Sequence, residues 1–478
     1  MAKILFIHRL EFAENTSLSI EILSSYLKLM GHETNLILDF YDSNFICRLY
    51  KRIKTYGPDL IGFSVLTPIY SWAIKVSEII KGEYDIPIVF GNVHASALPE
   101  LTLKNKHVDF VIRGEGEKAL SKLMTLIDTK PQNYSSVYNL CYKDADKIIY
   151  NPIENVISDL DSLPFPDKSI TKNEVPFYDD IYYCQIERGC PYNCSFCFNH
   201  FMREFYNKKG SWLRKRSVEN VIEELKMAKK QGYKFIYPYD DCFARDLNWL
   251  AKFVNLYKKY VNLPLEINSR FRYMSEETAR LLLEAKCISV KMGVQTTSER
   301  LLRNVCNRFV DKNAKEAVKN LKKYNILVKV DTMYNLPTQS EHDILEDIEF
   351  YTKLRPDFIT AYNLLYFPKT NIVNYGTRYG LITEKDIERI QHGGLRASYI
   401  KDKKLLSFMT IIAHLPVFII RFILKYKLWN KIPNMIFKYK IFLQIPYYIS
   451  TKSRFLLSVV HLRRRIRFKY YLLRFKMR

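Results

Sequence analysis

Three cysteines, Cys190, Cys194 and Cys197, lie within eight residues in the segment "ERGCPYNCSFCFNH". The other six cysteines are scattered singly, at positions 47, 141, 184, 242, 287 and 306. An odd total without paired spacings favours reduced thiols over a disulfide framework. The cysteine segment is therefore the best candidate in this sequence for a metal or cofactor site.

Several kinds of site could use three such thiols. A structural zinc ion takes four ligands, and His200 is the only nearby candidate for the fourth. A disulfide would use two thiols and leave one over. An iron-sulfur cluster with three protein ligands explains the count directly, because it leaves one iron open to a small ligand.

The pattern C-x-x-x-C-x-x-C, with Phe196 before its last cysteine, resembles the signature of radical S-adenosylmethionine (SAM) enzymes. The resemblance implies a 4Fe-4S cluster on Cys190, Cys194 and Cys197, with SAM on the open iron through its amino and carboxylate groups. An electron from a reducing partner would then cleave SAM to a 5'-deoxyadenosyl radical. Phe196 is expected to lie near bound SAM.

The cysteines follow the first of six candidate strands in the second half of the chain. The strand patterns cover 180–189, 233–240, 264–270, 288–294, 326–334 and 358–366. Helical patterns such as 217–232 and 314–325 separate them. This alternation predicts a partial (β/α)6 barrel, short of the eight strands of a complete one. Chemistry in barrels occurs at the carboxyl ends of the strands, where the cysteines fall.

The first 130 residues predict a separate α/β unit. Short apolar runs at 3–10, 34–40, 59–66, 85–92 and 108–114 alternate with amphipathic helical patterns. Such a pattern indicates a doubly wound, Rossmann-like parallel sheet, which binds ligands beyond the carboxyl ends of its strands. The candidate residues there are Ser64, Thr67, Gly91, Asn92, Gly114, Glu115 and Gly116.

Longer stretches resemble the subclass of radical SAM enzymes whose N-terminal domain binds cobalamin. The matching runs include "PDLIGFSVLT", "IVFGNVHASALPELTL", "DFVIRGEGEKAL", "DLDSLPFPD" and "TMYNLPTQSEHD", and they extend over roughly residues 1–390. The resemblance assigns the strand-end residues of the first unit to cobalamin. It assigns Asp240, Asp241, Arg270 and Gln295 to contacts with SAM.

The chain also departs from that subclass. Gln295 stands where a Glu is usual, and Asn335 to Gln339 replace a Gly-Leu-Pro-Gly-Glu-like run. We expect Asn335 to accept a left-handed turn and the β-branched Thr338 to tolerate it poorly. No D-x-H-x-x-G run offers cobalamin a histidine, so its lower face is expected to be vacant or water-filled.

Four regions follow from these patterns. We expect a cobalamin-binding-like domain at 1–130, a linker with a hairpin at 131–178, a radical SAM partial barrel at 179–392 and a basic, aromatic, helical tail at 393–478. The tail carries most of the charge. Residues 401–478 hold 19 Lys and Arg against one acid, so +18 of the formal +24 lies there.

The tail interleaves these cations with Trp, Tyr, Phe and Leu, which is typical of helices lying on an anionic membrane surface. Its apolar run at 408–424 is too short and interrupted to span a bilayer. A basic cap packed on the barrel and an RNA-binding segment are the alternatives, and nucleic acid is the less favoured partner. With no secretory signal pattern at the N-terminus, we expect a cytoplasmic protein, peripheral on the inner membrane face.

Together these features predict an enzyme that methylates an unactivated carbon of a small-molecule, lipid or lipid-linked substrate. Three alternatives remain: a cobalamin-dependent cyclase or rearrangement enzyme, a tRNA methylthiotransferase-like enzyme, and a non-enzymatic iron-sulfur or cobalamin carrier. Methylthiotransferases carry three further N-terminal cluster cysteines, whereas only Cys47 and Cys141 precede Cys184 here. The sequence assigns no catalytic side chain.

Overall fold

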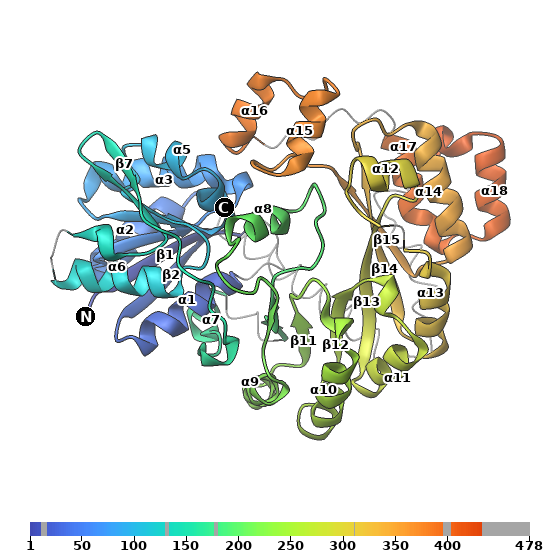
Figure 1. Cartoon of the computed structure of the whole chain (residues 1–478), viewed down its shortest axis with the longest axis horizontal. Coiled ribbons are helices and arrows are strands. Elements are labelled where there is room, and N and C mark those ends of the chain that lie inside the picture. Colours follow the sequence, from blue (N-terminus) through green and yellow to red (C-terminus); the bar gives the residue numbers. More distant parts are fainter. Residues whose placement is uncertain (11–16, 130–132, 176–179, 310, 395–402, 433–478) are drawn as a thin grey trace.

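The computed structural model describes residues 1–10, 17–129, 133–175, 180–309, 311–394 and 403–432. Two β-sheets organise this part of the chain, each with helices packed against it (Figure 1). One sheet belongs to the N-terminal third and the other to the middle and C-terminal parts. The site described below forms where the two meet.

The first sheet has a core of five parallel strands in the order β2-β1-β3-β4-β5. The strands are β1 (Lys3–Arg9), β2 (Glu33–Asp39), β3 (Leu60–Ser64), β4 (Ile88–Gly91) and β5 (Phe110–Ile112). They are almost wholly buried, as expected for a parallel sheet covered on both faces. The predicted doubly wound architecture is confirmed.

Alternating side chains of β1 divide the core of this unit into two layers. Ile4 and Phe6 pack on the face covered by α1 (Leu18–Leu29) and α6 (Glu117–Thr129). Leu5 and Ile7 pack on the face covered by α2 (Phe45–Tyr56) and α3 (Tyr70–Glu83). Two short helices, α4 (Asn92–Ala97) and α5 (Pro99–Lys104), follow β4.

A hairpin of β6 (Leu140–Asp144) and β7 (Lys147–Tyr150) lies in the segment expected to be a linker. It does not stand apart from the first unit. β6 pairs antiparallel with β5, so the hairpin extends the sheet to seven strands. A short helix, α7 (Lys168–Glu174), then leads toward the second sheet.

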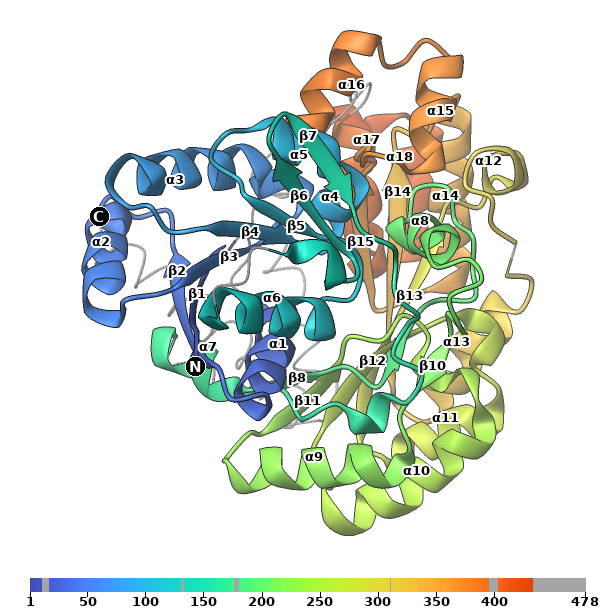
Figure 2. The ribbon, with the colours of Figure 1, turned by 60° about the vertical axis from the view of Figure 1, so that its left-hand side comes forward.

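The second sheet contains six parallel strands, ordered β15-β14-β13-β12-β11-β8. They are β8 (Ile181–Cys184), β11 (Phe235–Pro238), β12 (Leu265–Ser269), β13 (Cys287–Gln295), β14 (Leu327–Tyr334) and β15 (Phe358–Asn363). Each strand pairs with the next along the chain, which gives the predicted partial barrel (Figure 2).

Helices line the outer face of this curved sheet. They are α9 (Val218–Lys230), α10 (Leu247–Tyr260), α11 (Glu276–Glu284), α13 (Ala314–Lys323) and α14 (Glu341–Leu354). Their apolar faces share one core with outward side chains of the strands, including Ile236, Ile267, Val290 and Val330.

Shorter elements complete the described chain. A two-residue ladder joins β9 (Glu187–Arg188) to β10 (Arg214–Lys215), with α8 (Phe198–Phe205) between them. Beyond these lie α12 (Glu299–Asn304), α15 (Asn371–Arg378), α16 (Glu384–Gln391), α17 (Lys403–Ile411) and α18 (Val417–Lys425). Within the described residues, every helix is too short or too polar to cross a bilayer.

The two units share a hydrophobic core. Tyr183 of β8 and Tyr237 of β11 pack in the same apolar cluster as Ile20 of α1 and Leu123 of α6. Burial of large aromatic side chains is a major source of interface stability. We infer that this shared core fixes the first sheet against the barrel, so that loops from both can form one site.

Candidate functional site

The cysteine segment forms a loop between β9 and α8, beyond the carboxyl end of β8. Backbone hydrogen bonds tie its centre to distant segments. The Ser195 amide donates to the Cys306 carbonyl at 3.0 Å, and the Ser195 carbonyl accepts from the Ile372 amide at 2.9 Å. Within the loop, the Cys197 amide donates to the Cys194 carbonyl at 3.1 Å. These contacts hold the loop in one conformation.

The three thiols of this loop share one electrostatic environment. Burial, together with the nearby Asp241 carboxylate and the thiols of Cys194 and Cys190, raises the pKa of Cys197 to about 12. The Arg308 guanidinium lies 3.8 Å from the Cys194 sulfur. Within the described residues, no three His, Cys, Asp or Glu side chains gather closely enough to hold a single ion. The ligands of an iron-sulfur cluster bind separate irons and therefore lie farther apart than the ligands of a single ion. The absence of a single-ion site among the described residues is thus compatible with a cluster.

The thiol of Cys242, which the sequence analysis left among the scattered cysteines, lies beside the cysteine segment. It donates a hydrogen bond to the Cys190 sulfur, and that bond is the main reason why the pKa of Cys190 is lowered. Cys242 follows β11, so adjacent parallel strands bring it to the same edge as the loop. No sequence spacing could have linked residues so far apart.

Tyr192, inside the cysteine segment, is held between two side chains from the end of β12. The Arg270 guanidinium stacks on the Tyr192 ring, 3.7 Å from its centroid. The Tyr192 and Tyr273 hydroxyls are 2.6 Å apart and share a hydrogen bond. Such stacking of a buried guanidinium on an aromatic face is favourable. Arg270 and Tyr273 thus fix the loop between its first two cysteines.

Arg270, a predicted SAM contact, keeps free hydrogen-bond donors. Its Nη2 pairs with Asp311 at 3.3 Å, whereas its buried Nε and Nη1 have no partner among the residues that the structure describes. A buried donor without a partner is costly and points to a missing acceptor. Arg270 also contributes to lowering the pKa of Cys190. An anionic ligand group beside the cysteine loop would satisfy these donors.

Asp240, another predicted SAM contact, faces the protein interior with only 3% of its surface exposed. One oxygen accepts hydrogen bonds from the Ile186 and Glu187 amides, at 2.9 and 2.6 Å. Burial, followed by the nearby Glu187 carboxylate, raises the pKa of Asp240 to about 7. Its other carboxylate oxygen is buried without a partner. This geometry makes Asp240 a positioning residue for the strand that leads to the cysteines.

The remaining predicted SAM contacts lie around the same loop. Asp241 is exposed and accepts a hydrogen bond from the Asn199 amide at 2.7 Å. Phe196 packs against the cluster containing Leu336 and Leu364. Gln295 ends β13 with a left-handed backbone, φ 71°, and its carbonyl accepts from Thr332 Oγ1 at 2.8 Å. Their contacts with SAM stay predictions.

The turn after β14 adopts the conformation expected to be difficult for its β-branched residue. Asn335 and Thr338 both have left-handed backbones, with φ of 59° and 64°. Arg300 compensates at Thr338, donating to its hydroxyl at 2.7 Å and to its carbonyl at 3.2 Å. Hydrogen bonds from Arg300 therefore stabilise a left-handed conformation at Thr338 that glycine would adopt more readily.

His200, the only candidate for a fourth zinc ligand, uses both ring nitrogens in hydrogen bonds. One nitrogen contacts the Asn193 side chain and the other contacts the Asn371 amide at 2.5 Å. These bonds link the cysteine segment to α15. All nine cysteines are free thiols in this structure. The geometry therefore favours neither the zinc nor the disulfide interpretation.

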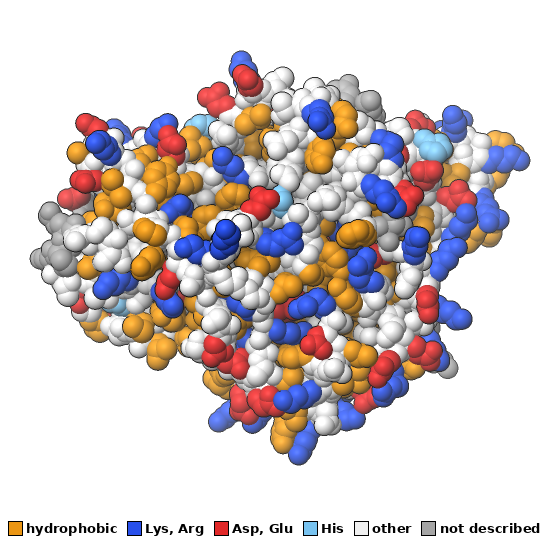
Figure 3. All heavy atoms as spheres, viewed as in Figure 1, with side chains coloured by type: hydrophobic (Ala, Val, Ile, Leu, Met, Phe, Trp, Pro, Cys, Tyr) orange, Lys and Arg blue, Asp and Glu red, His pale blue; other side chains and the backbone are white. Residues whose placement is uncertain are grey.

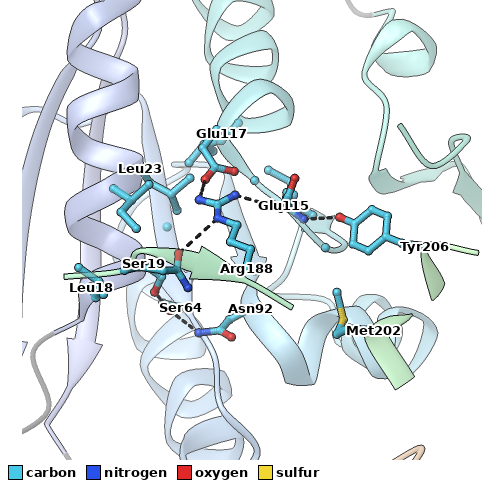
Figure 4. A pocket seen from close by; sticks show the side chains of 18 of the residues that line it. Leu18, Ser19, Leu23, Ser64, Asn92, Glu115, Glu117, Arg188, Met202 and Tyr206 are labelled. Atoms are coloured by element: carbon cyan, nitrogen blue, oxygen red, sulfur yellow. Dashed lines mark hydrogen bonds and ion pairs between the residues drawn. The ribbon is translucent and has the colours of Figure 1, made fainter. Parts of the chain in front are cut away.

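A cavity of about 370 Å³ opens between the first sheet and the cysteine loop (Figure 4). One wall comes from the first unit and includes Phe6, Gly62 and Ser64. The opposite wall includes Arg188 and Gly189, directly before Cys190. The cavity therefore places a ligand of the first sheet next to the cysteine segment.

Six of the seven predicted cobalamin-binding residues line this cavity, namely Ser64, Gly91, Asn92, Gly114, Glu115 and Gly116. The Asn92 amide donates to the Ser64 hydroxyl at 2.9 Å and holds both at the cavity wall. Thr67 does not line it. The Thr67 hydroxyl instead meets Nδ1 of the buried His94 at 3.2 Å. That bond assigns Thr67 to the packing of α4 against the sheet.

Close backbone approach explains the glycine at position 114. Gly114 has φ of 74°, and a Cβ there would lie 2.0 Å from the Tyr206 hydroxyl. The same hydroxyl accepts a hydrogen bond from the Glu115 amide at 2.6 Å. Tyr206 follows α8 directly, so this contact joins the first sheet to the segment after the cysteines.

A buried charge network closes the cavity between the two units. Glu115 lies 3.0 Å from Arg188 and 2.8 Å from Arg214, and Glu117 also pairs with Arg188. The two arginines lower the pKa of Glu115 despite its burial. The sequence suggested Glu115 only as a ligand contact and did not identify its arginine partners. No local signal marks an ion pair between residues this far apart.

Comparisons with known proteins agree with this arrangement. The B12 binding domain matches residues 13–124, and the radical SAM superfamily matches residues 185–351. The first match contains Gly62 and Ser64 of the first cavity wall but begins after Phe6. The second begins just before the cysteine segment and extends through most of the partial barrel.

Individual relatives align over most of this chain. An uncharacterised methyltransferase of Pyrococcus horikoshii is 25% identical over 357 residues, covering 73% of this chain and 76% of its own length. An anaerobic magnesium-protoporphyrin IX monomethyl ester cyclase of Rubrivivax gelatinosus is 25% identical over 351 residues, covering 70% and 61%.

Among solved structures, the fold resembles that of OxsB, a cobalamin-dependent SAM radical enzyme determined with aqua-cobalamin and SAM bound. The TM-score is 0.70 at 18% identity, and the alignment covers 94% of this chain and 71% of OxsB. At this identity the likeness concerns the fold.

Proposed function

Because this chain is a radical SAM enzyme whose first domain is a B12-binding domain, we propose that it methylates an unactivated carbon of a small-molecule or lipid-linked substrate. Its cofactors are a 4Fe-4S cluster, SAM and cobalamin. The observation that carries the proposal is the cavity between the two domains, lined on one side by Ser64 and Asn92 and on the other by Arg188 and Gly189.

The residues present fit the three groups. Three free thiols in one backbone-anchored loop suit a cluster with an open iron. The unpartnered Nε and Nη1 of Arg270 suit the carboxylate of SAM. The cavity also contains an unpartnered indole N–H from Trp212, which suits a polar ligand such as cobalamin.

When bound, the cluster and SAM supply radical chemistry at carbon, and cobalamin supplies a methyl carrier. The protein binds, orients and shields these groups. Asp240 holds the backbone of β9, and Arg270 with Tyr273 holds Tyr192 between the first two cysteines. The charge network around Arg188 lines the cavity and joins the two domains there. Exclusion of water from a reactive intermediate is the expected benefit.

A cyclase or rearrangement enzyme is the second candidate, supported by the likeness to the cyclase of Rubrivivax gelatinosus. A methylthiotransferase is less well supported, because the two cysteines that precede Cys184 do not share an environment: Cys47 is exposed on α2 and Cys141 is buried in β6. The methyltransferase and the cyclase differ in the products that they form from SAM.

The test is anaerobic. The protein is reconstituted with iron, sulfide and hydroxocobalamin, then given dithionite, SAM and a cell lipid extract or a metabolite extract. A methyltransferase yields both 5'-deoxyadenosine and S-adenosylhomocysteine, whereas a cyclase yields 5'-deoxyadenosine alone. Cys194→Ala is the control and should form no 5'-deoxyadenosine. Reconstituted protein that retains its cluster but makes neither product with any extract would contradict the proposal.

A further inference from the structure

The helix α18 presents an aromatic and cationic face to solvent at the edge of the barrel. Phe418, Phe422 and Tyr426 are 73%, 56% and 54% exposed, although large apolar side chains are normally covered. They lie four residues apart, so they form one stripe along the helix and its C-cap. The Phe422 and Tyr426 rings pack together, with centroids 4.9 Å apart.

Cations lie beside this stripe. Arg421 and Lys425 are exposed on the same side, three and seven residues after Phe418, and Lys427 and Lys431 follow the helix. The Lys425 ammonium lies 5.4 Å from the Tyr426 ring centroid. Figure 3 shows hydrophobic side chains next to Lys and Arg at the edge where Figure 1 places α18. No acidic residue occurs between Lys403 and Ile432.

The opposite side of α18 accounts for its folding. Ile420 is fully buried, and Ile423 and Leu424 pack against the barrel core, which also contains Trp429. Glu349 of α14 pairs with Lys353 at 2.5 Å and also interacts with Arg421 of α18. The exposed aromatic side chains are therefore not needed to hold α18 in place.

We propose that this face of α18 docks on the surface of a membrane containing anionic lipid. Aromatic rings favour the boundary between headgroups and acyl chains, and exposed Lys and Arg gain from a negative surface. The long apolar stems of Lys and Arg can lie along the same boundary while their charges reach the headgroups. A stripe of three aromatic rings among cations has the chemistry of such a boundary.

The sequence after α18 supports the same partner. Residues 433–478 contain Lys and Arg interleaved with aromatic and aliphatic residues, and no acid. These residues lie outside the described part of the structure, and the proposal concerns α18 itself. A second copy of this chain, whose α18 would carry the same positive charge, is disfavoured by like-charge repulsion.

The test uses full-length protein with a reporter on α18. Phe422→Trp is mixed with vesicles of brominated phosphatidylcholine, with or without phosphatidylglycerol. We expect blue-shifted emission and quenching by the bromines, both weakened by added salt. Tyr260→Trp is the matched control, because Tyr260 is an exposed aromatic residue flanked by lysines at the end of α10. Its emission should not respond to vesicles.

A charge variant tests the choice of lipid. Arg421→Gln with Lys425→Gln should weaken binding to phosphatidylglycerol-containing vesicles about tenfold or more, since each cation near the surface contributes about 1 kcal/mol. The proposal is overturned if Phe422→Trp emission is unchanged by vesicles. It is equally overturned if the emission shift depends on protein concentration or on added RNA instead of vesicles.

Discussion

The Arg188 guanidinium lies 3.0 Å from the Glu115 carboxylate, and this ion pair joins the cysteine loop to the B12-binding domain. Arg188 precedes Cys190, the first cysteine of the motif, by two residues, while Glu115 follows the last strand of the parallel core of the first sheet. Both side chains are largely buried. The position of the cysteine loop relative to the cavity therefore depends on a contact between the two domains.

Removing Arg188 should destabilise the protein strongly. Arg188→Met leaves two buried carboxylates, Glu115 and Glu117, without this partner, and such losses typically cost about 3–5 kcal/mol. Urea denaturation measures the change. Adding Glu117→Gln should restore part of it, because one buried charge is removed. Equal stability of the parent and Arg188→Met would show that the network is not important for stability.

Substitutions should distinguish the three cysteines that bind the cluster from Cys242, which only lies beside them. Cys190→Ala, Cys194→Ala and Cys197→Ala are each expected to lose most of the reconstituted cluster, measured as iron and sulfide content and visible absorbance. Cys242→Ala is the matched control, because this thiol is buried and touches Cys190 without belonging to the motif. It should keep the cluster. Loss of the cluster in Cys242→Ala would make Cys242 a ligand.

Arg270 should matter for SAM binding more than for the cluster. Arg270→Met keeps an unbranched apolar side chain but removes the guanidinium that stacks on Tyr192, and with it the donors Nε and Nη1. We expect SAM affinity to fall about tenfold or more, in line with the loss of a charged hydrogen bond. Equilibrium binding of SAM to the reconstituted protein measures it. Unchanged affinity with intact cluster content would remove Arg270 from the SAM site.

Gly114 should not tolerate a side chain. In Gly114→Ala the new Cβ would lie 2.0 Å from the Tyr206 hydroxyl, and the φ of 74° is strained for alanine. We expect a loss of stability of about 1–3 kcal/mol and weaker cobalamin retention on desalting. Adding Tyr206→Phe removes the clashing oxygen and should recover part of the loss. A fully stable Gly114→Ala would contradict the close packing of the two domains here.

The stability of the B12-binding domain should fall at acid pH. Burial, together with the nearby His392, lowers the pKa of His94 from 6.5 to about 4. The unfolded chain then binds more protons than the folded one between these values, so stability is full above about pH 6.5 and declines toward pH 4. The loss is up to about 3 kcal/mol.

Urea midpoints measured across this pH range test the effect. His94→Gln cannot titrate and should flatten the profile. It should not remove the slope, because burial also lowers the pKa of His8 to about 4. An unchanged profile in His94→Gln would mean that this imidazole does not stay neutral in the fold.

Much of this architecture follows from local sequence. Strand and helix periodicity predicted both parallel sheets, because the spacing of apolar residues directly reflects which faces are buried. Six of the seven residues predicted from the ends of those strands line the cavity, since the carboxyl ends of parallel strands meet at one edge. The three-cysteine motif could be recognised from the spacing of its cysteines alone.

The tertiary structure decided what depends on residues distant in sequence. It turned Asp240 inward toward the amides of Ile186 and Glu187, and it placed Thr67 against His94 instead of the cavity. It also brought Cys242 to Cys190. The sequence determined the chemistry of these side chains and the elements that carry them. Only the packing of the two domains determined which partner each one meets, because those contacts join segments that no local pattern relates.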